Sequence, residues 1–249
     1  MRIADVSIDF DFFVRENPYW DFGHVESRFF LTQAWDIRYT AIDLFTETAY
    51  ERYADFLPAQ LTGQLQSKGY RFDALPKSKR RFGTAESHRH AFKFLRRSPP
   101  PDVLLSLDAH HDLWATDVTG PALAQDWLVH LATKWTTTDI HVIYPAWKDM
   151  ALDGPPSITG PTLHQWAAFP TATEPTAIRH VFLCRSGAWV PPHHDPTVLA
   201  LGSELYSLSG QYTEMEPMIV RPQPDRDTMT AHREAHAQKM ATFLSRVDP

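Results

Sequence analysis

The ten residues 103–112 read VLLSLDAHHD, an apolar segment that runs directly into a polar one. A short and almost continuously apolar run is typical of a strand in a parallel sheet that is covered on both faces. After it, a carboxylate, an imidazole and a carboxylate stand at the alternating positions Asp108, His110 and Asp112, and the small Ala109 lets the chain turn closely. The stretch therefore predicts a buried strand whose carboxyl end carries polar chemistry.

Further strands and helices follow along the chain. Apolar runs predict strands at Ile3–Phe13, Val103–Asp108, Ile140–Tyr144, His180–Cys184 and, most weakly, Met218–Val220. Helical patterns lie at Trp35–Leu65, which is long enough for two helices, and at Ser87–Leu95, Pro121–Trp135 and Thr228–Val247. No linker, composition break or internal repeat divides the sequence. We therefore expect residues 1–249 to form one α/β domain, a three-layer sandwich with a mainly parallel central sheet.

The composition disfavours several classes of partner. With 249 residues, 43% of them hydrophobic, the chain has enough apolar material for a sizeable core. A formal net charge of −6 provides no basic field, and the cationic stretch at residues 77–81 is short, so we expect no nucleic-acid partner. No apolar run approaches the length of a membrane span, so we expect no membrane partner. The sequence gives no indication of an oligomeric state.

The single cysteine, Cys184, allows neither an intramolecular disulfide nor a thiolate cluster for zinc or iron–sulfur. The N-terminal residues also lack the charged, apolar and small-residue zones of a signal peptide. Both features predict a reducing, cytoplasmic location. Any metal ion would then be held by oxygen and imidazole.

A second acidic pair ends the first predicted strand. Period-two alternation points Asp9 and Asp11 in the same direction. Two like charges this close repel each other unless a cation lies between them. Because ligands of open parallel sheets bind beyond the carboxyl ends of the strands, we expect this pair to meet Asp108, His110 and Asp112.

The segment from Glu86 to His90 supplies one more candidate ligand. Ser87 is a plausible N-cap of the helical pattern that follows, which would place His88 in the first helical turn at the edge of the crevice. We take His88 as the sixth ligand and His90 as an ordinary surface histidine.

Carboxylate and imidazole ligands without sulfur favour hard divalent ions, with manganese preferred and iron, cobalt or zinc as alternatives. Two such ions about 3.5–4 Å apart can share and activate one water.

These motifs resemble those of the arginase or ureohydrolase superfamily, in which a metal-binding histidine segment, D-A-H-x-D and S-x-D-x-D occur in that order. Residues 108–112 match D-A-H-x-D in full, residues 7–11 match S-x-D-x-D, and residues 86–88 are a loose counterpart of the histidine segment. The S-x-D-x-D element comes first here, which looks like a circular permutation. With D-A-H-H-D-L-W from residue 108, D-W-L from residue 126 and C-R-S-x-x-W from residue 184, the chain looks most like the peptide arginases.

Peptide arginases convert arginine side chains in a ribosomally made precursor peptide to ornithine and urea. The resemblance therefore implies such a peptide as partner, two Mn²⁺ ions as cofactors and a metal-bridging hydroxide as the nucleophile. It implies six metal-binding side chains, which are the bridging Asp9 and Asp108, then His88 with Asp112 on one ion and His110 with Asp11 on the other. Asp112 or the neighbouring His111 would relay a proton to the leaving amine.

A guanidinium substrate also needs a carboxylate with matching fork geometry. Glu86, Asp126 and Glu26 are alternatives for this role, and Asp126 is equally plausible as the N-cap of a helix.

Two tryptophans and one arginine are further candidates for contact with the substrate. Trp114 and Trp189 would wall the site and lie against the arginine stem. Arg185 follows another predicted strand and would either touch the substrate or pair with an acid of the metal-binding loop.

Three other functions remain open from the sequence. The same ligands serve related amidino- and amidohydrolases that act on a free guanidino compound or an acetylated amine, although the deacetylases are expected to lose a ligand and use a single zinc. A non-catalytic module with structural metal would more often be rich in cysteine. A dehalogenase-like phosphatase would use Asp9 as its nucleophile, which leaves residues 108–112 unexplained.

Overall fold

The centre of the fold is a parallel sheet. A computed structural model describes residues 1–14, 28–41, 57–114, 118–148, 163–166 and 168–247. Seven of the eight described strands follow the order β6-β5-β4-β1-β7-β3-β8, the short β2 also pairs with β7, and every pairing among them is parallel. The strands are β1 (Arg2–Asp9), β2 (Tyr70–Arg71), β3 (Arg81–Ala85), β4 (Val103–Leu107), β5 (Asp139–Ile143), β6 (Leu163–Trp166), β7 (Thr176–Cys184) and β8 (Gln211–Glu214).

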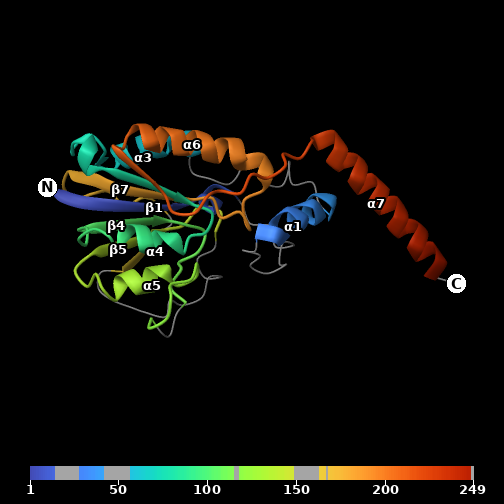
Figure 1. The fold of residues 1–249 in the computed structure, drawn as a ribbon, viewed down its shortest axis with the longest axis horizontal. Helices are drawn as coiled ribbons and strands as arrows, with labels where there is room; N and C mark the ends of the chain where they lie inside the picture. Colours follow the sequence, from blue (N-terminus) through green and yellow to red (C-terminus); the bar gives the residue numbers. More distant parts are fainter. Residues whose placement is uncertain (15–27, 42–56, 115–117, 149–162, 167, 248–249) are drawn as a thin grey trace.

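Helices cover both faces of the sheet and complete three layers (Figure 1). α3 (Leu61–Ser67) and α6 (Asp195–Ser207) lie on one face, and α4 (His90–Leu95) and α5 (Trp127–Ala132) lie on the other. The predicted α/β sandwich with a mainly parallel sheet is therefore confirmed.

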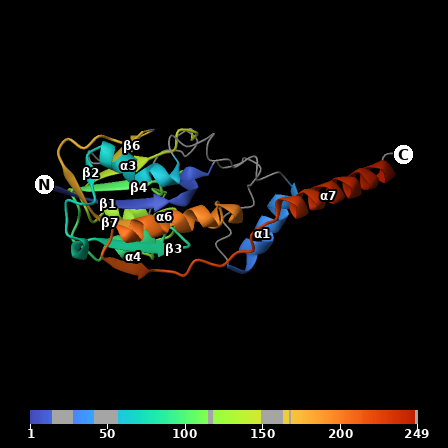
Figure 2. The same ribbon diagram turned by 90° about the horizontal axis from the view of Figure 1, so that it is seen from above.

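The remaining two helices lie beyond the end of the sheet. α1 (Arg28–Ala41) contacts the start of α7 (Arg226–Val247), where the Arg233 guanidinium donates to the Tyr39 carbonyl at 3.4 Å. From there α7 projects away from the sandwich (Figure 2). The assignment of residues 1–249 to one domain stays a prediction.

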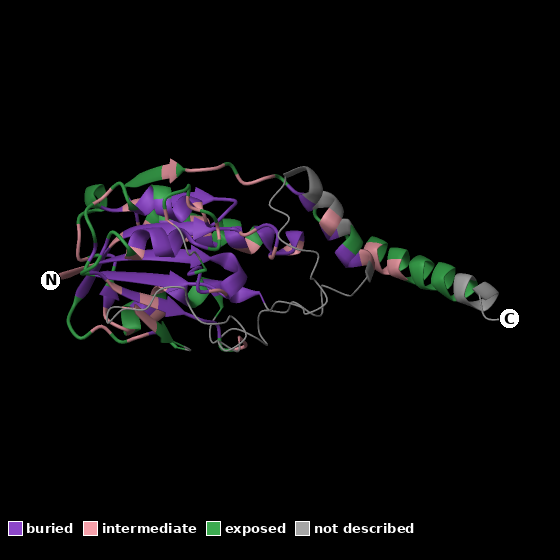
Figure 3. Cartoon of the chain, turned by 90° about the horizontal axis from the view of Figure 1, so that it is seen from below, coloured by how far each residue is buried: buried purple, intermediate pink, exposed green. Residues whose placement is uncertain are grey.

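Alternation along the strands builds two hydrophobic cores. Ala4, Val6 and Ile8 of β1 belong to the core that includes side chains of α3 and α6. The core on the other face includes Phe94 of α4 and Trp127 of α5. Burial is accordingly concentrated in the sandwich, whereas most described side chains of α7 are exposed (Figure 3).

The opposite side of β1 is polar, which is unusual for a central strand. Asp5, Ser7 and Asp9 are each less than 5% exposed. Asp5 is compensated by Arg179, whose Nη2 and Nε donate to its two carboxylate oxygens at 2.6 Å and 3.1 Å. Ser7 and Asp9 lie further towards the carboxyl end of β1, next to the candidate metal ligands.

The first predicted strand and the predicted helix Ser87–Leu95 differ from the structure at one end. β1 stops at Asp9 instead of Phe13, because Phe10–Phe13 form a 3-10 turn in which the Asp9 side chain accepts a hydrogen bond from the Asp11 amide. α4 begins at His90, so Ser87 is not its N-cap.

The weakest predicted strand, Met218–Val220, is wrong. The strand in this part of the chain is β8, and Val220 is 94% exposed. Residues 218–220 instead cross from β8 towards α7, and the Ile219 amide donates to the Glu86 carboxylate at 3.0 Å.

Other elements were only partly predicted or were not predicted at all. The helical pattern Trp35–Leu65 corresponds to the described α1 and α3, and its residues 42–56 lie outside the described chain. The pattern Pro121–Trp135 shortens to α5, while α6 and the strands β2, β3, β6 and β8 were not predicted. Most of these strands are short and carry polar residues, so they lack the continuous apolar run that identified β4.

The packing of β3 against α4 leads to a stability prediction. A Cβ on Gly83 would lie 2.6 Å from the ring of the fully buried Phe94, whereas nothing lies within 4 Å of a Cβ on Gly63 in α3. We expect Gly83→Ala to lower the free energy of unfolding by ~1–3 kcal/mol through overpacking. We expect Gly63→Ala to raise it by about 0.5–1 kcal/mol through helix propensity. Urea unfolding measures both, and a shift of the same sign in the two variants would contradict this packing.

Candidate metal centre

The predicted ligands converge at the carboxyl edge of the sheet. β1 lies between β4 and β7, so Asp9 ends its strand beside the ends of both neighbours. Asp108 follows β4 directly, and His88 lies in the turn between β3 and α4. The position agrees with the rule that ligands of open parallel sheets bind beyond the carboxyl ends of the strands.

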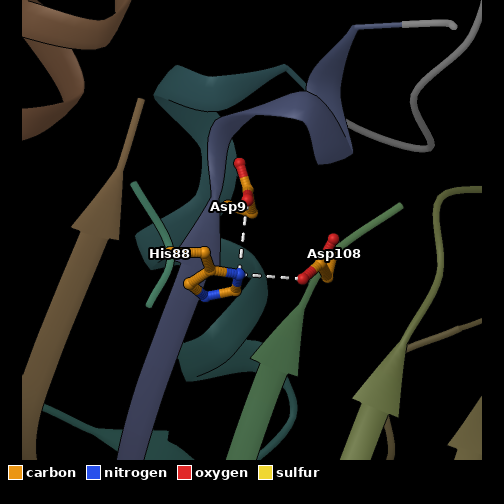
Figure 4. Close-up of side chains that lie close together, drawn as sticks. All are labelled: Asp9, His88 and Asp108. Carbon is orange, nitrogen blue, oxygen red and sulfur yellow. Dashed lines mark ion pairs between the residues drawn. The ribbon is translucent and has the colours of Figure 1, made fainter. Parts of the chain in front are cut away.

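The first group of ligands surrounds the ring of His88. Its Nδ1 lies 3.0 Å from Asp108 Oδ2, 3.0 Å from Asp112 Oδ2 and 3.2 Å from Asp9 Oδ2. Figure 4 shows Asp9 and Asp108 approaching this nitrogen from two neighbouring strand ends. One imidazole nitrogen and three carboxylate oxygens therefore point at one small space.

The second group surrounds His110. Its Nδ1 lies 3.4 Å from Asp11 Oδ2 and 3.7 Å from Asp108 Oδ1. The two carboxylate oxygens of Asp108 therefore face different histidines, and Asp108 belongs to both groups. Asp9 belongs to the first group, and its other oxygen accepts a hydrogen bond from the Asp11 amide at 3.3 Å.

These side chains have the chemistry of a cation site. His88 Nδ1 and Asp108 Oδ2 are both buried and lie 3.0 Å apart, but neither has a partner with hydrogen-bond geometry. Such atoms are costly to bury unless something binds them. A divalent cation accepts both an imidazole lone pair and carboxylate oxygens, and it would offset the negative charge of four converging aspartates. The buried Asp and His groups could therefore hold a metal ion.

Neighbouring polar groups fix the orientation of the first group. Ser7 Oγ lies 2.8 Å from His88 Nε2, which leaves Nδ1 directed at the carboxylates. The Trp127 indole donates to Asp112 Oδ2 at 2.6 Å, and the Ser186 hydroxyl donates to Asp9 Oδ2 at 2.5 Å. Partners of this kind hold metal ligands in their binding geometry.

Two residues of the site have a left-handed backbone. The φ angle is 52° at Asp112 and 50° at Ser186. This region is sparsely populated by residues other than glycine, and such strain gathers at functional sites because the surrounding structure holds it in place.

Burial and crowding change the proton affinity of the site. Burial, followed by the charge of Asp9, raises the pKa of Asp11 to about 6. Burial, followed by the charge of Asp108, raises the pKa of Asp112 to about 6. Burial alone would lower the pKa of His88, but its contacts with the three acids of its group raise it well above the ordinary value. These groups therefore bind protons more readily than ordinary aspartate and histidine side chains do.

A pocket opens onto both groups, and aromatic residues form part of its wall. All six predicted ligands line it, together with Trp114 and Trp189. The ring of His110 lies 6.1 Å from that of Trp114 and 5.7 Å from that of Trp189. Both tryptophans are therefore positioned where the sequence placed them, beside the metal ligands.

The residues predicted to bind the substrate differ in whether they line the pocket and in which groups they contact. Glu86 lines the pocket, but it accepts hydrogen bonds from Arg185 and from the Ile219 amide. Arg185 is 3% exposed and is not among the lining residues. Asp126 precedes α5 as its N-cap and accepts from the Leu123 amide at 2.6 Å, away from the lining. Glu26 lies outside the described residues.

His111 is fully buried and is not among the residues that line the pocket. Its Nδ1 accepts from the Leu113 amide at 2.9 Å, and its ring packs 4.6 Å from that of Trp114. Asp112 lines the pocket, so of the two proposed proton carriers it is the one with access to a substrate.

Glu216 is a pocket residue that sequence reasoning missed. It lines the pocket beside the metal ligands, and its side chain is 17% exposed. Its Oε2 lies 3.3 Å from Nε2 of His90, which is 9% exposed, so the expectation of a surface histidine was wrong. The signal for Glu216 was its position two residues after β8, a strand that the sequence did not reveal.

Comparisons with protein-family models, with curated proteins and with solved structures found no match to this chain. In the described part of the chain, no helix combines the length and the apolar character that a membrane crossing needs.

The contact between Ser7 and His88 predicts a loss of metal affinity. Ser7→Ala removes the partner that orients the imidazole, so we expect Mn²⁺ affinity to fall about 10–100-fold while the fold persists. Ser106→Ala is the matched control, because Ser106 is equally buried and pairs with Ser7 across β1 and β4. Isothermal titration calorimetry measures the affinities. Equal affinity in the two variants would show that Ser7 does not support a ligand.

The raised pKa values predict pH-dependent metal binding. The pKa of Asp11 and of Asp112 is raised to about 6, and the pKa of His88 is raised well above its ordinary value. A protonated side chain cannot bind the ion. We therefore expect Mn²⁺ affinity to fall by about tenfold or more from pH 7.5 to pH 5.5, with protons released on binding. Calorimetry in buffers of different ionisation heat counts these protons. Affinity that is constant over this range, without proton release, would contradict the ligand assignment.

Proposed function

We propose that this chain is a dinuclear metal hydrolase of the arginase or ureohydrolase type. Its reaction would convert arginine side chains of a ribosomally made precursor peptide to ornithine and urea. The observation that carries the proposal is the position of Asp108, whose two carboxylate oxygens face two different histidine-containing groups. Such a carboxylate can hold two cations close together, which is the arrangement that hydrolysis of a resonance-stabilised guanidinium requires.

The proposed cofactors are two Mn²⁺ ions, with Fe²⁺, Co²⁺ or Zn²⁺ as alternatives, because the candidate ligands offer oxygen and imidazole but no sulfur. Bound together, the ions would supply a water of lowered pKa as the nucleophile. His88, Asp9 and Asp112 would hold one ion and His110 with Asp11 the other. We also propose a cytoplasmic location, since the one cysteine, Cys184, is free and buried.

The chain's own residues would orient the substrate and move the proton. Glu216 is better placed than Glu86 to receive the guanidinium, because Arg185 already occupies the Glu86 carboxylate. Trp114 and Trp189 would flank the arginine stem. Asp112, which lines the pocket, would carry the proton to the leaving amine.

A second candidate is an amidino- or amidohydrolase that acts on a free guanidino compound or an acetylated amine. The presence of two histidine-containing groups favours two ions over one. This supports guanidine hydrolysis over the single-zinc chemistry expected of a deacetylase.

The decisive assay combines metal content with urea release. We expect protein purified with Mn²⁺ to bind about two ions and to release urea from an arginine-containing peptide but not from free arginine. Asp108→Ala should lose both ions and all activity, because Asp108 contributes to both groups. Asp73→Ala, on a surface aspartate with 69% side-chain exposure, is the matched control and should keep both.

Three results would separate the alternatives. Urea from free arginine alone would favour the second candidate. Two ions without urea from either substrate would retain the metal site and reject guanidine hydrolysis. Full metal occupancy in Asp108→Ala would reject the site itself.

A further inference from the structure

The metal pocket contains one cationic side chain whose role the proposed reaction leaves open. Arg89 is the only lysine or arginine among the described residues that line the pocket. It follows His88 directly and is the N-cap residue of α4, so its backbone is fixed by the same turn that positions a candidate metal ligand. The Arg89 side chain therefore starts from a fixed backbone position beside the candidate metal ligands.

Two other arginines near the pocket are fully engaged inside the protein. Arg185 donates to Glu86, to Asp195 at 3.0 Å and to the Ile219 carbonyl at 2.7 Å. Arg221 donates to Asp195 and to the carbonyl oxygens of residues 187 and 190. Each is 3% exposed. Both arginines therefore stabilise the wall of the pocket through contacts within the protein.

Arg89 differs in exposure and in the length of its contacts. Its side chain is 41% exposed, compared with 17% for Glu216. Its Nη2 lies 3.7 Å from Glu216 Oε1, which exceeds hydrogen-bond length, and its Nε lies 3.4 Å from His90 Nε2. The Arg89 side chain is therefore partly exposed and lines the pocket, next to the acid proposed to receive the substrate.

We propose that Arg89 binds a carboxylate of the substrate. This inference rests on the function proposed above, and it narrows the substrate to a guanidinium that has an acidic group nearby. On binding, the substrate guanidinium would pair with Glu216 and the substrate carboxylate would pair with Arg89. The long Arg89–Glu216 contact would thus be replaced by two closer charge-assisted pairs, for which the fork of an arginine is well suited.

The carboxylate can come from two sources that share this chemistry. It is either the α-carboxylate of an arginine at the end of a chain or the side chain of an acidic residue beside an internal arginine. Two pairs of substrates, assayed with the Mn²⁺-loaded protein, distinguish these sources. The two members of each pair differ only in the charge of one group. The first pair is N-acetylarginine and its amide, and the second is acetyl-Gly-Arg-Glu-amide and acetyl-Gly-Arg-Gln-amide.

The test compares urea release from the four substrates by wild-type protein and by variants of Arg89. We expect wild-type kcat/KM to be about tenfold higher for the charged member of at least one pair, as for one charge-assisted contact. In Arg89→Met the ratio should fall to about one, whereas Arg89→Lys should keep part of it because the charge remains. Arg96→Met, on the C-cap arginine at the opposite end of α4, whose guanidinium lies over the Phe92 ring, should keep the wild-type ratio.

Each result has a distinct meaning. A preference confined to one pair identifies the source of the carboxylate. Equal rates for charged and neutral members in the wild type, or a ratio unchanged in Arg89→Met and Arg89→Lys, would overturn the role of Arg89 and leave the proposed function standing. No urea from any of the four substrates would overturn the proposed function, and the inference with it. Metal content and circular dichroism of each variant establish that the site and the fold are intact.

Discussion

The mutual repulsion of buried carboxylates is the constraint on which the rest of this structure depends. Four aspartates end or follow β1 and β4, all of them less than 8% exposed, and the two strands are neighbours in the sheet. Asp108 stands at the centre because each of its oxygens faces a different histidine. Cations or protons can compensate such a cluster, and burial, followed by the charge of a neighbouring aspartate, raises the pKa of Asp11 and Asp112 to about 6.

The wall of the pocket is held by a second, internally balanced set of charges. Arg185 and Arg221 both bind Asp195, and Arg185 also binds Glu86. Arg221 donates to two carbonyls of the loop that contains Gly187, where a Cβ would lie 2.0 Å from a Glu86 oxygen. Buried ion pairs add little net stability, but they define one arrangement of the chain. This arrangement places the Ser186 hydroxyl on Asp9.

The buried acids of the protein differ in the groups that compensate their charge, and this difference separates the acids of the pocket wall from those of the metal groups. Acids that meet arginines of the protein are neutralised in place, as Glu86, Asp195 and Asp5 are. The acids of the two metal groups meet histidines, neutral donors such as Ser186 and Trp127, and one another, and they could hold a metal ion. Glu216 is intermediate, because His90 and Arg89 approach it at 3.3 Å and 3.7 Å while it still lines the pocket. The proposed exchange with a substrate guanidinium makes use of this position.

The sequence by itself determined the mainly parallel sheet and the convergence of the five candidate ligands that end or follow β1 and β4, because both are set by local patterns. The tertiary structure decided that His88, which follows β3, joins them. A continuous apolar run specifies a covered strand, and the residues that end it must lie at the carboxyl edge. Only the tertiary structure decided that Arg185 occupies Glu86, that His111 does not line the pocket and that Glu216 enters it. The pairing of Arg185 with Glu86 joins residues 99 positions apart, and Glu216 follows an edge strand without an apolar signal. Such contacts depend on how distant segments pack, which no local pattern encodes.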